Sequence, residues 1–425
     1  MQQADIAIIG YGFAGGMVLA NLVRQAMGAC RIAIIDDTPH AARGTAYGTR
    51  YAEHVLNVRA GNMGAFAGDV GGFQHWRTTN GDAGTAYDFA PRMRYGDYLE
   101  TIQNDTRALA QQKHIALQYI AASVQHMAAH DGTVTLTLSH GATLSASRVV
   151  VATGNVFSTP ADAAIDRAPW FADIPALIAR APQRVALIGS GLTAMDTIIS
   201  LLQGGYQGEI CCISRHGWLP QPHVPPAPAA AINVDALMHG TLSQRLRTLR
   251  RMIAHAESWH QVIDGLRPHT VALWRSLSLA EQQRFMARLF TLWNIHRHRI
   301  DAALYQRLTQ APNMRIMQAS FLRRDDAGVV VKTTHGEQHI AAGMVFDCRG
   351  PSYRALPAFL AQAADDGLIT RHGLAGVCEV GEAYRISTAA PIYAIGTPLI
   401  GERLETTAVP ELRVQAHAVA TVLLS

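Results

Sequence analysis

The stretch Ile6-Ala-Ile-Ile-Gly10-Tyr-Gly12-Phe-Ala-Gly15 decides the fold of this chain. Its apolar start is typical of a parallel strand that is covered on both faces. The glycines that follow have the G-x-G-x-x-G spacing of a turn that leads into a helix and holds a dinucleotide pyrophosphate. Gly10 allows the tight turn, Gly12 lets the backbone approach the phosphates, and Gly15 lets the helix pack closely on the strand.

The residues after this turn complete a strand–helix–strand unit. Apolar residues recur at helical spacing over 17–27, and a second apolar strand is predicted over 32–35. The first turn of the helix, with Phe13 and Ala14, offers free N–H groups and a positive dipole end to phosphates. Asp36 follows the second strand and is favoured as the acceptor for an adenosine ribose, with Asp37 as the alternative. A glycine turn without a ligand is the structural alternative.

A second copy of the unit lies near the middle of the chain. Strands are predicted over 184–188 and 209–213, on either side of a glycine turn and a helix over 195–202. Arg215 follows the second strand, where no carboxylate is present for a ribose hydroxyl. Because a guanidinium pairs with phosphate in a bidentate manner, this residue predicts NADPH as the coenzyme, unless it is only a solvated surface arginine. The residues expected to hold the coenzyme are Gly189, Gly191, Leu192, Thr193 and Arg215.

Composition limits the classes of protein and partner. The 425 residues suggest two or three domains, and with 49% hydrophobic and 16% charged residues a disordered or coiled-coil chain is excluded. The net charge of +4 is spread thinly, so a nucleic-acid partner is not expected. No histidine or cysteine spacing predicts a metal site. No apolar stretch is long enough to predict a membrane span, so no membrane partner is expected.

The cysteines and the first residues bear on the compartment. The chain has five cysteines, an odd number without CxxC spacing, which favours reduced thiols. The first residues lack the basic start and cleavage site of a signal peptide. A cytoplasmic location is therefore expected.

The expected fold class is α/β, with two dinucleotide-binding (Rossmann-like) domains and a helical insertion. Residues 1–160 and 346–425 are expected to form the first domain, and 161–345 the second. A proline-rich linker over 220–228 precedes the insertion, which is predicted over about 225–310 and is expected to cover part of the cleft.

The chain resembles the bacterial FAD/NAD(P)-binding proteins that are related to class B flavoprotein (flavin-containing) monooxygenases. The resemblance extends over nearly all of the chain, and it implies FAD in the first domain and NADPH in the second. The motifs that carry it are Gly10–Gly15, Gly44-Thr-Ala-Tyr47, His54-Val-Leu-Asn57-Val, Ala152-Thr-Gly154, Gly189–Asp196, Ser214-Arg215, Trp293 with His296-Arg-His-Arg299, and Glu405-Thr-Thr-Ala-Val-Pro-Glu411-Leu-Arg413-Val-Gln-Ala416.

The resemblance also implies a reaction. NADPH would reduce FAD, and a flavin C4a-hydroperoxide would transfer one atom of molecular oxygen to a small amine or sulfur substrate. Asn57 would lie beside the flavin as the catalytic residue; the alternative is an asparagine that caps a loop. Two other functions stay open, an NAD(P)H-dependent flavin oxidoreductase without oxygen insertion and an FAD-binding redox sensor. A homodimer also stays open.

The expected FAD contacts include a second helix start near the C-terminus, at Thr406 and Thr407, whose dipole would face the flavin. The residues 296–299 form either a solvated basic face or a place where Arg297 or Arg299 meets an anionic substrate or the NADPH phosphates, with His223 nearby. The residues expected to hold FAD are Gly10, Gly12, Phe13, Ala14, Gly15, Asp36, Asn57, Met63, Val124, Thr153, Gly154, Gly396, Thr406 and Thr407.

Overall fold

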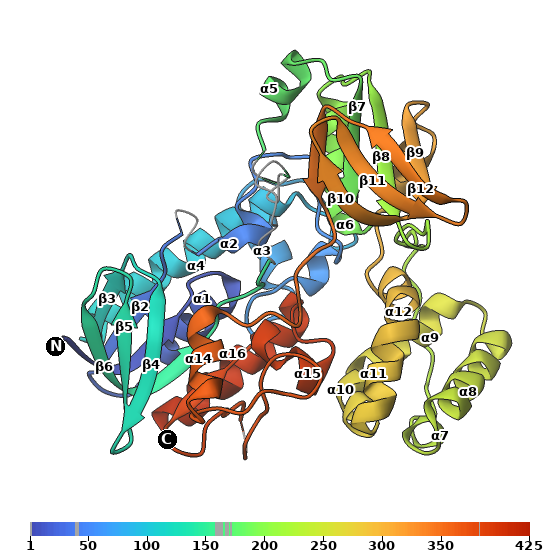
Figure 1. Ribbon diagram of the computed structural model, residues 1–425. Helices are drawn as coiled ribbons and strands as arrows, with labels where there is room; N and C mark the ends of the chain where they lie inside the picture. The colour runs from blue at the N-terminus through green and yellow to red at the C-terminus, as the bar shows by residue number, and fades with distance from the viewer. Residues whose placement is uncertain (1, 39–41, 158–164, 166–169, 171, 382) are drawn as a thin grey trace.

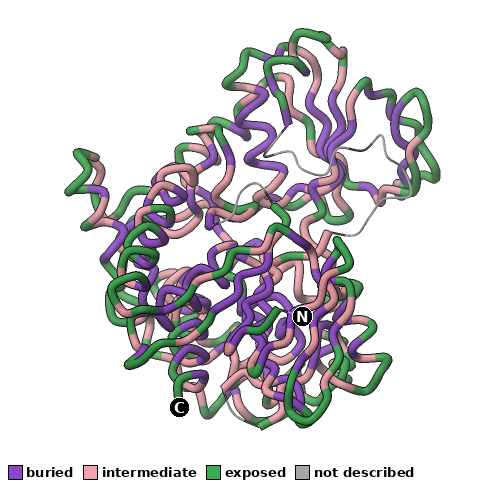
Figure 2. Tube along the Cα trace, turned by 90° about the vertical axis from the view of Figure 1, so that its left-hand side faces the viewer, coloured by how far each residue is buried: buried purple, intermediate pink, exposed green. Residues whose placement is uncertain are grey.

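The computed structural model describes residues 2–38, 42–157, 165, 170, 172–381 and 383–425. Two α/β domains lie next to each other, and a group of helices extends beside them (Figure 1). The buried segments gather in the middle of each α/β domain (Figure 2). The predicted fold class, two Rossmann-like domains with a helical insertion, is confirmed.

The first domain is built on a seven-stranded sheet in the order β3-β2-β1-β6-β5-β4, with β14 also paired to β6. β1 lies between β2 and β6 and is parallel to both, while β4, β5 and β6 form an antiparallel meander. The strands are β1 (Gln2–Ile9), β2 (Arg31–Ile35), β3 (Ala116–Ile120), β4 (Val124–His130), β5 (Thr133–Leu138), β6 (Thr143–Val151) and β14 (Ile392–Ala394).

Helices from both ends of the chain cover this sheet. On one face α1 packs against α16 and α4, so the C-terminal helix completes the core around β1. On the other face α14 packs against β4. The helices are α1 (Phe13–Gln25), α2 (Gly44–Tyr47), η1 (Ala60–Asn62), α3 (Gly72–Thr79), α4 (Arg92–Gln112), α14 (Ala358–Asp365), η3 (Thr397–Leu399), α15 (Ile400–Arg403) and α16 (Val409–Leu424).

The second domain has a four-stranded parallel sheet in the order β13-β7-β8-β9, with a three-stranded antiparallel sheet packed on it. The domain boundary predicted at residue 345 falls inside β13, which ends at Asp347 because it pairs with β7 up to Ile188. The elements are α5 (Ile174–Ala179), β7 (Arg184–Ile188), α6 (Leu192–Gln203), β8 (Glu209–Ser214), β9 (Met314–Gln318), β10 (Ser320–Asp325), β11 (Gly328–Thr333), β12 (Gly336–Ala341) and β13 (Met344–Asp347).

The helical insertion connects β8 to β9. Side-chain caps start several of its helices; Thr241, for example, forms a capping box with Gln244 at the start of α8. The insertion contacts the C-terminal tail, where Trp274 Nε1 donates to the carbonyl of Gly401 at 2.7 Å. Its helices are α7 (Asp235–Met238), α8 (Leu242–His255), α9 (Trp259–Leu266), η2 (Arg267–His269), α10 (Thr270–Arg275), α11 (Leu279–Arg288), α12 (Phe290–Arg297) and α13 (Ala302–Thr309).

A buried histidine connects the two domains. His54 lies between Thr49 of its own domain, at 2.8 Å, and Ser200 of α6, also at 2.8 Å. Its Nε2 is also 3.1 Å from the carbonyl oxygen of Asp196. Burial lowers the pKa of His54, so the imidazole is neutral at pH 7 and its bonds hold α6 against the first domain. In the part of the chain that the structure describes, no helix has both the length and the apolar character for crossing a membrane.

Candidate functional site

The first glycine turn is shaped as the sequence predicts. Gly10 has φ +98°, and a Cβ placed on it would lie 2.4 Å from the carbonyl oxygen of Ala152. A Cβ on Gly15 would lie 1.9 Å from the carbonyl oxygen of Gly10. At Gly12 the nearest atom to such a Cβ is 3.6 Å away, the Cα of Gly44. The first and third glycines are therefore needed for backbone packing, while Gly12 borders open space.

The start of α1 offers unpaired N–H groups to that space. Gly12 is the N-cap residue, no side chain caps the helix, and its first turn contains no acidic residue. The bond from Gly16 N to the Gly12 carbonyl, at 2.9 Å, is the first of the helical ladder. The preceding N–H groups and the positive end of the helix dipole therefore form an anion site.

A cavity of about 320 Å³, here called the first cavity, lies in front of this turn. The 44–47 motif on α2, residues 152–155 after β6, and residues 395–397 after β14 complete its walls. Thr407 reaches it from the start of the C-terminal helix. The predicted residues that line the first cavity are Gly10, Gly12, Phe13, Ala14, Asp36, Thr153, Gly154, Gly396 and Thr407.

Asp36 is the carboxylate of the first cavity, whereas Asp37 does not line it. Its Oδ2 accepts the N–H of Tyr11 at 2.5 Å. Oδ1 of Asp36 accepts the N–H and the hydroxyl of Thr38 at 2.8 and 2.6 Å. These bonds fix the carboxylate at the end of β2, where a ribose acceptor is expected.

Two further features of the first cavity fit a dinucleotide. The hydroxyl of Thr153 is buried and has no hydrogen-bond partner among the residues that the structure describes. Gly154 has φ +66°, and a Cβ placed on it would meet no atom within 4 Å. A buried polar group without a partner is costly, so a ligand group that bonds to Thr153 would remove that cost.

Five of the residues predicted to hold FAD do not line the first cavity. Gly15 packs behind the turn, and Met63 and Val124 are buried in the hydrophobic cores on opposite faces of the sheet. Their positions were set by packing, which sequence spacing does not reveal. The fourth, Thr406, is buried and accepts the amide of Gln415 at 2.8 Å. Asn57, the fifth, lies outside the first cavity, and its carbonyl oxygen is 3.1 Å from His223 Nε2.

The second glycine turn opens into a cavity of about 470 Å³, the second cavity. A Cβ on Gly189 would lie 2.6 Å from the carbonyl oxygen of Cys348, whereas one on Gly191 would meet nothing within 4 Å. Gly191 is the N-cap of α6, which has no side-chain cap and no acidic residue in its first turn. The second turn therefore repeats the anion site of the first.

Arg215 lines the second cavity together with residues that were not predicted from the sequence. Arg215 is exposed, and no described side chain or carbonyl group pairs with it. Arg349, in contrast, pairs with Asp347 at 2.7 Å, which raises the pKa of the guanidinium. Arg349 was missed, although it follows β13 closely and could have been found as the counterpart of the residues after β6. Trp218 and Phe321 also line this cavity.

A third space of about 280 Å³, the middle cavity, lies where the two nucleotide cavities meet. It shares Gly191 and Arg349 with the second cavity, and Asn155 and Thr407 with the first. Leu192 and Thr193 from α6, Trp293 and His298 from the insertion, and Thr406 from the tail also line it. A group held here is thus within reach of ligands in both nucleotide cavities.

The helix start predicted at Thr406 and Thr407 is displaced. α16 begins at Val409, with Ala408 as N-cap and no side-chain cap, so neither threonine caps it. Thr407 and Ala408 line the middle cavity instead. Pro410 has no N–H and the Glu411 N–H donates to the Ala408 carbonyl at 3.1 Å, so it is the positive end of the α16 dipole that lies where the two cavities meet.

Buried charges stand behind the middle cavity. Glu405 accepts the indole N–H of Trp293 at 3.0 Å and Arg297 Nε at 2.8 Å. Burial raises the pKa of Glu405 against the opposing charge of Arg297. His298 lies 2.8 Å from the side-chain oxygen of Asn294, and burial together with Arg297 lowers its pKa to about 3. The imidazole of His298 is therefore neutral at pH 7.

Both interpretations of the 296–299 motif are wrong. Arg297 is buried and pairs with Glu405, and its Nη2 lies 3.8 Å from Glu411, so it neither faces water nor reaches a phosphate. Arg299 is buried as well and pairs with Asp264. The reason is that α12 packs between the insertion and the tail, where carboxylates from both meet its arginines.

The cysteines form no disulfide. All five are free, and three of them, Cys211, Cys212 and Cys348, are buried. Burial raises the pKa of each of these three thiols, and Cys348, beside the middle cavity, is raised well above its ordinary value. None of the three is a thiolate nucleophile at neutral pH. Among the described residues, no group of three or more metal-binding side chains comes together.

Comparison with known proteins agrees with this geometry. Residues 7–156 match the family described as FAD-NAD(P)-binding. No curated protein matches the chain in sequence. The protein is similar over its whole length to solved flavoenzyme structures of low sequence identity.

One such structure is the reduced form of ornithine hydroxylase from Pseudomonas aeruginosa, with a TM-score of 0.64 and 16% identity over 99% of this chain and 98% of that one. Ornithine N-hydroxylase from Kutzneria sp. 744, with reduced FAD, NADP+ and L-ornithine, has a TM-score of 0.63 and 16% identity over 99% of both chains. Thioredoxin reductase from T. acidophilum has a TM-score of 0.52 and 14% identity over 100% of this chain and 98% of that one. Residues 7–156 thus match an FAD-NAD(P)-binding family, and the chain as a whole has the two-domain Rossmann-type fold of these solved flavoenzyme structures.

Proposed function

We propose that this protein is an FAD-dependent, NADPH-using monooxygenase that transfers one oxygen atom from molecular oxygen to a small amine or sulfur nucleophile. The observation that carries the proposal is the middle cavity, where Gly191 and Thr407 bring the second and first cavities together. The similarity in fold to two ornithine hydroxylases supports the same class of reaction.

The first cavity fits FAD. The N–H groups at the start of α1 would bind its pyrophosphate, and Asp36 would accept hydrogen bonds from its ribose. Thr153, whose buried hydroxyl has no partner in the described part of the chain, would bond to the flavin part of the molecule. Bound FAD supplies the acceptance of a hydride and the reduction of oxygen, and the chain supplies position and environment.

The second cavity fits NADPH. The N–H groups at the start of α6 would bind the pyrophosphate, and the unpaired guanidinium of Arg215 would bind the 2′-phosphate. Trp218 and Phe321 offer aromatic faces along the same cavity. The middle cavity would then receive the nicotinamide.

The residues of the middle cavity control charge and water. The uncapped start of α16, beside Thr407, would stabilise negative charge on a reduced flavin. His298 is held neutral by burial and Arg297, so it would not repel a cationic nicotinamide. Phe290, Trp293 and Tyr353 supply apolar wall area that limits the access of water.

Asn57 is proposed as the catalytic residue because the resemblance implies a place beside the flavin, although it lines neither the first nor the middle cavity. His223 and the Asn57 carbonyl oxygen, 3.1 Å apart, fix the backbone of this segment. Among the described residues, none makes a hydrogen bond to the side-chain amide of Asn57.

Rapid mixing of the NADPH-reduced protein with oxygen tests the proposal. We expect a transient spectrum that matches neither reduced nor oxidised flavin, followed by oxygenated product when an amine or sulfide is present. Direct return to the oxidised spectrum, with peroxide formed in proportion to NADPH, would overturn oxygen insertion.

That second outcome would identify a flavin oxidoreductase without oxygen insertion, the other candidate. The thioredoxin reductase with the same fold favours it. The raised pKa of the buried thiols Cys211, Cys212 and Cys348 speaks against a thiol-exchange version of that reaction.

A further inference from the structure

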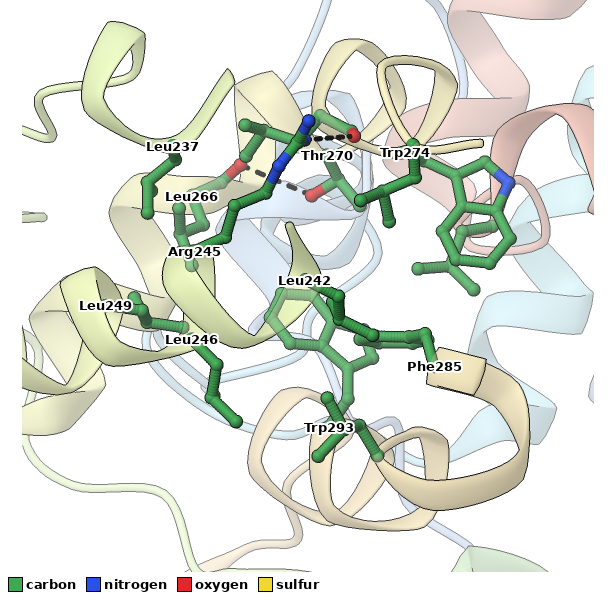
Figure 3. A pocket seen from close by; sticks show the side chains of 14 residues that line it. Leu237, Leu242, Arg245, Leu246, Leu249, Leu266, Thr270, Trp274, Phe285 and Trp293 are labelled. Atoms are coloured by element: carbon green, nitrogen blue, oxygen red, sulfur yellow. Dashed lines mark hydrogen bonds between the residues drawn. The ribbon is translucent and has the colours of Figure 1, made fainter. Parts of the chain in front are cut away.

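A fourth cavity, which none of the expected cofactor contacts reaches, lies inside the helical insertion. It has a volume of about 130 Å³, and residues from α7 through α12 line it together with Leu404 of the tail (Figure 3). Leucines of α8, among them Leu242, Leu246 and Leu249, line it, and so does Phe285 of α11. We call it the insertion cavity.

The polar side chains that line the insertion cavity already form hydrogen bonds within the protein. Arg245 donates to the carbonyl of Gly240 at 3.0 Å and, through both terminal nitrogens, to the hydroxyl and carbonyl of Ser276 at 2.6 and 3.1 Å. Thr270 donates its hydroxyl to the carbonyl of Leu266 at 3.2 Å, as Figure 3 shows. The guanidinium and the hydroxyl are therefore not offered to a ligand.

The two indoles are paired in the same way. Trp274 donates to the carbonyl of Gly401 at 2.7 Å, and Trp293 donates to Glu405 at 3.0 Å. The insertion cavity consequently presents carbon atoms. A water molecule needs two to four polar partners to be stable in a cavity, so this space favours an apolar occupant.

The insertion cavity adjoins the proposed reaction site. Trp293 and Leu404 line both the insertion cavity and the middle cavity. Leu404 has φ +39°, a left-handed conformation that residues other than glycine seldom adopt and that is often found at functional sites. Trp293 and Leu404 are thus part of the walls of both spaces, so an apolar cavity lies directly next to the middle cavity.

We infer that the substrate is amphipathic, with a hydrocarbon chain or aryl group bound in the insertion cavity and its nucleophilic end in the middle cavity. An apolar cavity of about 150 Å³ holds one benzene molecule, so this one has room for roughly six carbons. The inference rests on the proposed function only in assigning the reacting end to the middle cavity. The binding of the apolar part depends on the insertion cavity alone.

Primary n-alcohols from propanol to octanol test the apolar binding directly. Their affinity for the flavin-containing protein would be measured by tryptophan fluorescence, since Trp274 and Trp293 line the cavity. We expect the dissociation constant to fall about fourfold per added methylene and to level off near six carbons. These alcohols contain no amine or sulfur to oxygenate, so the result is independent of the flavin reaction.

Substitutions at Leu246 locate the binding. Leu246→Trp would fill the cavity and is expected to weaken hexanol binding at least about tenfold, while Leu246→Ala would extend the series to longer chains. Leu279→Trp is the matched control, because Leu279 lies in the same insertion but is exposed and outside the cavity. It is expected to leave the series unchanged.

An affinity that does not depend on chain length, or a series that Leu246→Trp and Leu246→Ala leave unchanged, would overturn the inference. The n-alkylamines separate it from the proposed function. Amine oxidation with a kcat/KM that rises with chain length supports both. Oxidation without any chain-length effect overturns the inference alone, and chain-length-dependent binding without oxidation of either the amines or the matching alkyl sulfides overturns the proposed function alone.

Discussion

The imidazole of His223 lies 3.1 Å, through Nε2, from the carbonyl oxygen of Asn57. The two residues are 166 positions apart in the chain. The His223 ring also packs against Phe89, with ring centroids 4.6 Å apart. The linker that leads to the helical insertion is thereby attached to the segment that carries the proposed catalytic asparagine.

Asn57→Ala is expected to uncouple the reaction. Without the amide, hydride transfer from NADPH should continue, while the oxygenated flavin loses one hydrogen-bond donor that is worth about 2–3 kcal/mol. NADPH consumption would then be diverted to hydrogen peroxide and product formation would fall. The measurement is the ratio of peroxide to NADPH consumed; a variant as tightly coupled as the wild type would remove Asn57 from the mechanism.

Acidification is expected to destabilise the fold at His223, because its protonated ring is buried while it keeps the hydrogen bond to Asn57. Burial is the main cause that lowers the pKa of His223 to about 4. A histidine in the unfolded chain has a pKa of about 6.5. Its folded pKa is depressed, so the unfolded chain binds the proton more readily. The stability contribution is therefore complete above pH 6.5 and is lost as the pH falls towards 4, by at most about 3 kcal/mol.

His223→Gln keeps a donor but cannot titrate, so it serves as the comparison for this pH effect. The difference in free energy of unfolding between wild type and variant, measured by urea denaturation, should shift in favour of the variant between pH 6.5 and 4. A difference that is constant over this range would mean that His223 titrates normally.

Gly12→Val is expected to abolish FAD retention. Its side chain would occupy the space in front of the α1 N-terminus and meet Gly44, whose Cα is 3.6 Å from a Cβ at this position. Retention would be measured as flavin absorbance per protein after gel filtration, with a loss of at least about tenfold expected. Gly28→Val is the control, since a Cβ at Gly28 meets nothing within 4 Å. Full flavin content in Gly12→Val would argue against the first cavity as the FAD site.

Arg215→Ala is expected to reduce the preference for NADPH. A charge-assisted bond to the 2′-phosphate is worth about 1.5–3 kcal/mol, so KM for NADPH should rise roughly ten- to a hundredfold. NADH lacks this phosphate and serves as the internal control, with a nearly unchanged KM. Arg215→Lys should recover part of the loss because it restores the charge. Equal losses for both coenzymes would show that Arg215 has a structural role only.

Arg297→Met is expected to destabilise the protein by about 3–5 kcal/mol, because it leaves the buried carboxylate of Glu405 without its cation. The double variant Arg297→Met/Glu405→Gln should recover a large part of this loss, since the remaining group is neutral. Thermal unfolding of the two variants measures the effect. If the double variant is as unstable as the single one, the packing of Arg297, and not its charge, stabilises the contact between insertion and tail.

The sequence by itself determined the two strand–helix–strand units and their glycine turns. The strand predicted over 184–188 has the same bounds in the structure, and those predicted over 32–35 and 209–213 each extend one residue further at one end. Gly10, Gly12 and Asp36 could be assigned because their roles depend on backbone conformation and spacing within about 30 residues. These roles are local, so the order of the residues contains them.

Only the tertiary structure decided what lies between the units. The pairing of Arg297 with Glu405, the contact of Asn57 with His223, and the burial of Met63 and Val124 join or enclose segments far apart in the chain. The middle and insertion cavities arise where the insertion meets the C-terminal tail. Such positions follow from the packing of whole elements and from the need to pair buried charges, and no local pattern of residues specifies them.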